Sequence, residues 1–262
     1  MELSRTSGRL EAFYQRYVHQ DDIEINPDTF DSSQYDEQTL LRGRRAWTLR
    51  TNDEYRSMVA FSELTHLCAE MHAPLDVIAL SSRLIRDEVR HVELCSQMTN
   101  LTGGRMAKAP TPQYARTNPK QSTRTRALHH AIGSCAIGET ISVTMLAGTR
   151  DHCTDPVAKA TLTQMLKDES FHSRFGWLWM PQMNLTEHDL KWLDWFVPRV
   201  FGGLISAVPM SKKPYTPSPF GSLPNQERKD RLYEAIDEII EGFEDHGLAG
   251  KRWWNERIEP NK

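Results

Sequence analysis

Two short motifs of one form hold the residues best suited to chemistry in this sequence. They occupy residues 87–91 and 168–172, and each reads Asp-Glu-x-x-His. Residues three apart share a face of a helix, so each motif presents a carboxylate beside an imidazole: Glu88 with His91, and Glu169 with His172. Carboxylate and imidazole together suit divalent iron or manganese. One such pair is common on protein surfaces, but two copies predict a metal centre.

Both motifs fall on the apolar side of a predicted helix. Ile78, Leu84 and Val92 mark that side around the first motif, and Leu162 with Leu166 marks it around the second. An ionised Glu is costly to bury unless a partner compensates its charge. A bound metal ion provides that compensation.

A two-metal site in a helical bundle needs one more Glu from each partner helix. Glu139 is the only acid between Ala127 and Arg150, and it shares a face with Ile132 and Val143. It precedes Glu169 by 30 residues. We therefore predict that Glu139 is the additional ligand of the second half.

Two candidates compete for the same role in the first half. Glu54 lies on the side of Met58 and Phe61, and it precedes Glu88 by 34 residues, close to the spacing of the second half. Glu63 precedes Glu88 by only 25 residues and lies on the opposite side of the helix. Glu54 is the preferred ligand. Glu63 is the fallback, because a helix capped at residues 52–53 would place Glu54 in its first turn.

The predicted ligand set is therefore Glu54, Glu88, His91, Glu139, Glu169 and His172. Its four carboxylates match the charge of two divalent cations, and a zinc site would more often use thiolate or fewer carboxylates. Asp87 and Asp168 point about 100° away from the neighbouring Glu. They are either carboxylates that orient a ligand His by hydrogen bonding or exposed helix acids.

The elements that position these residues form two helical hairpins. The first runs from about residue 47 to 101 with a break at residues 72–74, and the second from about 127 to 176 with a turn at 151–156. Residues 103–127 contain Lys and Arg but no acid, and we expect a crossover loop there. A fifth helix opens at Thr186 and should end or kink near Val197, because Pro198 follows.

The predicted fold is all-α: an antiparallel four-helix core with one crossover, additional C-terminal helices and an N-terminal extension. The division is an extension at residues 1–45, a bundle at 46–206, a proline-rich linker at 207–225, and a C-terminal helix and tail at 226–262. Five prolines between residues 209 and 224 define the linker.

Composition favours a cytoplasmic protein. The net charge of −3 makes nucleic acid an unlikely partner, no signal peptide is evident, and no window approaches the apolar length of a membrane span. The four cysteines have no CxxC spacing and are expected to be reduced thiols. A homodimer is the commonest assembly for such a protein.

The order of a Glu and an ExxH, a crossover, then a second Glu and ExxH resembles the ferritin-like di-iron carboxylate superfamily. Residues 47–61, 87–93 and 168–177 are most similar to bacterial ferritin-like proteins of unassigned activity, and more distantly to di-iron monooxygenases and N-oxygenases. The N-oxygenases carry an additional His where this chain has Met165.

The resemblance implies a cofactor of two iron ions, with manganese as an alternative. It implies an O2-activating oxidase or monooxygenase acting on a small organic substrate, with an external electron donor. The alternatives are a ferroxidase or other iron-handling protein, and a manganese catalase or peroxidase. The substrate and reaction type are not readable from the sequence, and function inferred from a fold is an association.

Overall fold

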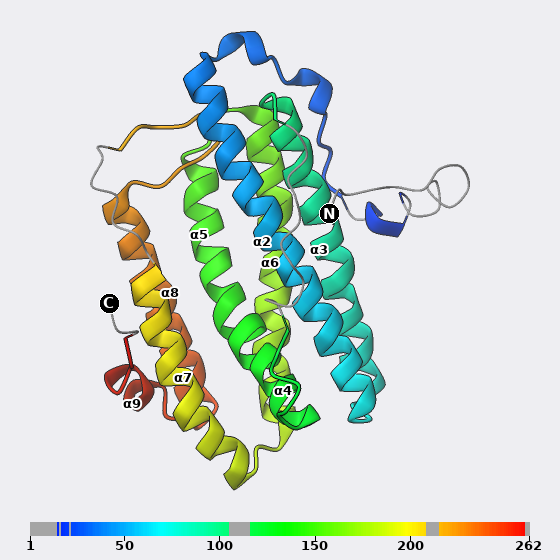
Figure 1. Ribbon diagram of the computed structural model, residues 1–262, viewed down its shortest axis with the longest axis vertical. Helices are drawn as coiled ribbons and strands as arrows, with labels where there is room; N and C mark the ends of the chain where they lie inside the picture. Colours follow the sequence, from blue (N-terminus) through cyan, green and yellow to red (C-terminus); the bar gives the residue numbers. More distant parts are fainter. Residues whose placement is uncertain (1–14, 16, 21, 105–115, 208–214, 260–262) are drawn as a thin grey trace. The chain divides into compact units, whose positions relative to one another are not determined.

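A computed structural model describes residues 15, 17–20, 22–104, 116–207 and 215–259 (Figure 1). The described residues form helices and loops and contain no strand, which confirms the all-α prediction and is compatible with a helical bundle. The α-helices are α2 (Glu37–Glu70), α3 (Leu75–Leu101), α4 (Thr123–Leu128), α5 (Glu139–Asp151), α6 (Pro156–Trp179), α7 (Glu187–Ala207), α8 (Asn225–Asp245) and α9 (Gly250–Asn255). Shorter elements are η1 (Pro27–Thr29), η2 (Ser32–Gln34), the π-helix η4 (His129–Gly138) and η5 (Met180–Met183).

The chain divides into two compact units. The first comprises the described residues up to Arg116, together with 149–168 and 217–222. The second comprises 117–148, 169–216 and the chain from Leu223 onward. The division predicted at residues 45, 206 and 225 is not tested by this clustering and stays a prediction.

Helices α2 and α3 form the hairpin of the first unit and run side by side (Figure 1). Helix α2 begins at Glu37, earlier than the expected start near residue 47, because the Asp36 side chain caps it by accepting from the Thr39 N–H. Glu54 therefore lies in the interior of a long helix. The hairpin turns where expected, at His72 with a positive φ of 53° and at Pro74, which precedes α3.

The segment before α2 packs onto the rest of the first unit. The Ile23 N–H donates to Gln164 on α6 at 2.8 Å, and the Tyr35 hydroxyl donates to Asp155 at 2.8 Å. The Tyr35 ring also stacks edge-on against Phe220. The N-terminal extension thus contacts the core of this unit; residues 1–14, 16 and 21 of it lie outside the described residues.

In the second unit, α5 lies against the second half of α6. The Thr140 and Ser173 hydroxyls are 2.8 Å apart, and the Trp177 indole N–H donates to Thr140. Helix α8 runs antiparallel to α5, since Arg231 near its start touches Gly148 at the end of α5. The helices α7 and α9 complete the unit, with Phe201 of α7 packed edge-on against Trp254 of α9.

Two helical features differ from expectation. Helix α7 continues through Pro198 to Ala207. The prediction that this helix ends near Val197 is therefore wrong. Leu193, Val197 and Phe201 are fully buried, and burial of this apolar face offsets the cost of an interior proline, about 3 kcal/mol. The second difference is that the helix expected from about residue 127 contains the π-helix η4 immediately before Glu139.

Within the described residues, the stretch Thr123–Asp151 is long and apolar enough to cross a membrane, which corrects the expectation that no window approaches a span. Half of its most apolar window is buried inside the protein. The predicted absence of a membrane partner stays a prediction. The predicted crossover and linker fall partly on residues 105–115 and 208–214, which lie outside the described residues.

Candidate metal centre

The first unit supplies three of the predicted ligands from two helices. Glu54 comes from α2, and Glu88 and His91 lie one turn apart on α3. Nδ1 of His91 is 3.5 Å from a Glu54 carboxylate oxygen and 3.7 Å from one of Glu88. This nitrogen therefore faces the carboxylates and is the atom placed to bind a metal ion.

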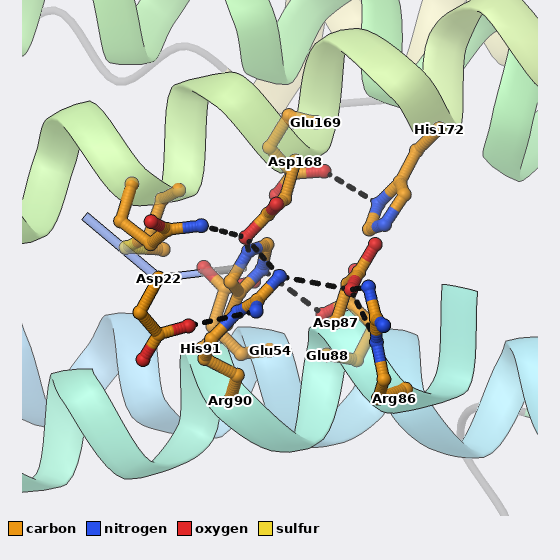
Figure 2. Close-up of polar contacts among 12 residues, drawn as sticks. Asp22, Glu54, Arg86, Asp87, Glu88, Arg90, His91, Asp168, Glu169 and His172 are labelled. Carbon is orange, nitrogen blue, oxygen red and sulfur yellow. Dashed lines mark hydrogen bonds and ion pairs between the residues drawn. The ribbon is translucent and has the colours of Figure 1, made fainter. Parts of the chain in front are cut away.

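The other nitrogen of the His91 ring, Nε2, contacts Asp168. Nε2 of His91 donates to Asp168 Oδ2 at 3.2 Å, and the same oxygen accepts from Gln164 at 2.9 Å and pairs with Arg90 at 2.9 Å (Figure 2). Asp168 thus contacts the side of the His91 ring opposite Nδ1, and its role in orienting a metal ligand stays a prediction.

The charges around His91 shift two pKa values. Burial alone would lower the pKa of His91, but the hydrogen bond to Asp168 and the nearby carboxylates of Glu54 and Glu88 outweigh burial and raise it well above its usual range. Burial alone would raise the pKa of Asp168, but hydrogen bonds from His91 and Gln164 and the Arg90 charge lower it. A metal ion at Nδ1 would compete with a proton for this nitrogen, because only the deprotonated nitrogen can be a ligand.

Asp87, which occupies the same motif position as Asp168, is surrounded by arginines. It pairs with Arg83 at 3.2 Å, Arg86 at 2.8 Å and Arg90 at 2.9 Å. Both aspartates are at most 1% exposed, so the alternative that they are exposed helix acids is wrong. Their burial as ions is possible because each has a guanidinium partner.

The second unit supplies the other three predicted ligands. Glu139 is the first residue of α5, and Glu169 and His172 lie one turn apart on α6, where the His172 Nδ1 donates to Glu169 at 2.9 Å. The π-helix η4 ends at the residue before Glu139. Short π segments insert an extra residue per turn and re-aim the side chains that follow, and they occur frequently at functional sites.

The six predicted residues fall into two overlapping groups that could each hold a metal ion. Every member offers one ligand atom, and within a group these atoms lie within 4.8 Å of one another. All six residues are at most 7% exposed. The groups are Glu54, Glu88, His91 and Glu169, and Glu88, Glu139, Glu169 and His172.

The fallback ligand Glu63 is in neither group and is half-buried on α2. The four cysteines are all buried, and no disulfide joins them. Cys95, one turn beyond His91, contacts the Met165 sulfur at 3.7 Å, so the position where N-oxygenases carry a further His is here an apolar sulfur contact.

Sequence reasoning missed three parts of the site. Arg90 could have been found from its spacing, because it lies three residues after Asp87 on the same helix face. Gln164 lies four residues before Asp168 and was visible by the same rule. Asp22, which pairs with Arg90 at 2.8 Å, comes from a distant segment and carries no local signal.

Comparison of the chain with protein-family models, curated proteins and solved structures gave no match. The helical fold and the buried Glu and His groups are compatible with a ferritin-like protein. The function is therefore argued from the side chains themselves.

Proposed function

We propose that this protein is a ferritin-like di-iron oxidase or monooxygenase that uses O2 to oxidise a small organic substrate. The observation that carries the proposal is that the two candidate groups share Glu88 and Glu169. Glu54, Glu88, His91 and Glu169 would hold one ion, and Glu88, Glu139, Glu169 and His172 would hold the other.

The donor set fits two iron ions. Four buried carboxylates and two imidazoles balance the charge of two divalent cations, and this oxygen-rich mixture suits iron or manganese better than zinc. Without cations, four carboxylates so close together and so deeply buried would be strongly destabilising. The fit rests on the chemistry of the donors and on their burial.

The chain's own residues prepare the site in three ways. Asp168 holds the Nε2–H of His91, so that Nδ1 is directed at the carboxylates. The buried sulfur atoms of Cys95 and Met165 form an apolar contact beside the ligands, which disfavours water there. A bound di-iron group supplies the electrons for O2 reduction. The carboxylates supply negative charge that stabilises the higher iron oxidation states, and an external donor must return the electrons.

Anaerobic loading with Fe(II) tests the proposal. Metal bound per chain is counted, O2 is admitted, and the visible spectrum is followed. We expect two irons per chain and a transient visible band in the wild type, and loss of both in Glu139→Ala. The exposed Glu241→Ala is the matched control and should behave as the wild type.

Other results assign other functions. Many irons per chain in a large assembly would indicate iron storage. Retention of manganese with rapid peroxide turnover would indicate a catalase or peroxidase. Less than one metal ion per chain and no reaction with O2 would refute the oxygenase proposal.

A further inference from the structure

Two hydrogen-bonded routes lead to His91 from a short segment before α2, of which residues 18–20, 22 and 23 are described. We propose that Asp22 in this segment is a positioning residue of the metal centre, acting through Arg90 and Asp168 on His91. The inference rests on the proposed metal site and extends it to a part of the chain that offers no ligand.

The first route passes through the guanidinium of Arg90, whose contacts with Asp22, Asp87 and Asp168 are drawn in Figure 2. The Arg90 side chain is fully buried. Its Nη1 donates to Asp22 at 2.8 Å and to the Val18 carbonyl at 3.0 Å. Its Nη2 donates to Asp87 at 2.9 Å and pairs with Asp168 at 2.9 Å. Because the guanidinium is planar and rigid, the partners of Nη1 fix the direction in which Nη2 points.

The second route passes through Gln164. Its Oε1 accepts from the Ile23 N–H at 2.8 Å, and its Nε2 donates to Asp168 at 2.9 Å. An amide group has a fixed angle between its two ends, so the Ile23 backbone determines where the Gln164 donor lies. Arg90 and Gln164, the two other groups that contact Asp168 Oδ2, are thus both oriented by this segment.

The segment is itself fixed to α3. One side of the His19 ring hydrogen-bonds to Asp22, and its Nε2 lies 2.9 Å from Glu93. These residues line a cavity of about 290 Å³. The connected series Glu93, His19, Asp22, Arg90, Asp168 and His91 therefore runs from a cavity to a proposed ligand.

Asp22→Asn tests the proposal because it removes charge without changing size. Co(II) alone is the probe, since its affinity and its visible d–d bands report on ligand geometry. We expect about a tenfold loss of affinity and altered d–d bands, in line with the effect of outer hydrogen-bond partners on metal sites. Asp28→Asn removes the same charge at an exposed position of η1, outside this segment, and should change neither.

A double-mutant cycle separates positioning from general destabilisation. If Asp22 acts through Asp168, Asp22→Asn should have little effect on affinity in an Asp168→Asn background. An equal loss in both backgrounds would overturn the proposal. Gln164→Leu interrupts the second route without altering a buried charge. It should also weaken Co(II) binding; this result tests the route through Ile23 and is independent of Asp22.

The metal-free protein gives a separate readout. In histidine-labelled protein, the Nε2 proton of His91, hydrogen-bonded to Asp168, should change its NMR frequency in Asp22→Asn and not in Asp28→Asn. An unchanged frequency would overturn the inference even if the wild type binds metal. A changed frequency in a chain that binds no metal would support the positioning role and refute the proposed function alone.

Discussion

Replacing Glu139 with Gln should stabilise the metal-free protein and destabilise the metal-bound one. The Glu139 ligand oxygen lies within 4.8 Å of ligand oxygens of Glu88 and Glu169. At this separation and an effective dielectric constant of about 20, two carboxylates repel each other by about 3.5 kcal/mol. This value holds for two full charges 4.8 Å apart: a closer approach raises the repulsion, and a proton shared within the cluster lowers it.

With metal present, the effect of Glu139→Gln on stability should reverse. A metal at about 100 times its dissociation constant stabilises the native wild type by about 2.7 kcal/mol. Glu139→Gln loses a charged ligand and with it most of that gain. In a chain of this size, about 1 kcal/mol corresponds to roughly 2–4 °C in Tm. The variant should therefore melt several degrees above the wild type without metal and below it with metal.

Anaerobic calorimetry, once with chelator and once with excess Fe(II) or Mn(II), measures the change in Tm without and with metal. Glu241→Gln, an exposed position in the same unit, controls for the loss of one charge and should shift Tm little in either condition. A lower Tm for metal-free Glu139→Gln would show that the carboxylates do not repel in the native state. An undiminished rise with metal would show that Glu139 is not a ligand.

Three further outcomes are expected. Glu54→Ala should abolish metal binding while Glu63→Ala leaves metal content near that of the wild type, and the reverse result would make Glu63 the ligand. Gly176→Ala should lower the free energy of unfolding by about 1–3 kcal/mol, because its Cβ would lie 2.5 Å from the Ala136 nitrogen. The helical control Gly203→Ala, whose Cβ would have no neighbour within 4 Å, should raise it by about 0.5–1 kcal/mol, and thermal unfolding measures both. Burial raises the pKa of Cys68 and Cys153 to about 12, above the ordinary value of 9.0, so the free energy of unfolding should fall as pH rises from 9 to 12; denaturant titrations showing no fall would contradict this.

The proposed ligands were predictable because helical geometry links sequence spacing to a shared face. Glu88 and His91 needed only the three-residue rule, and the 30-residue and 34-residue separations selected Glu139 and Glu54. Helix ends were predictable where local chemistry decides them, as at Pro74. The start of α2 was also readable, since Asp36 followed by Glu37 is a capping signal that the apolar pattern near Trp47 obscured.

The remaining features depend on contacts between distant residues. Pro198 stays inside α7 because tertiary burial outweighs its local cost. The π-helix η4 packs its backbone against Gly176, at a distance where any side chain would collide. No propensity scale contains that contact, so the interruption before Glu139 could not be read from residues 129–138 alone.

Arg90 gives the repeated Asp of the two motifs a common explanation. Asp87 and Asp168 occupy equivalent positions, and both pair with the Nη2 of this one guanidinium. Lysine has a single charged nitrogen and no rigid fork, so it could not hold these two carboxylates and Asp22 in fixed directions together. The Asp of each motif therefore binds an internal cation, which leaves the Glu beside it for an external one. On this reasoning the Asp of each motif fixes the structure around His91, and the Glu supplies the negative charge that the proposed metal ion would balance.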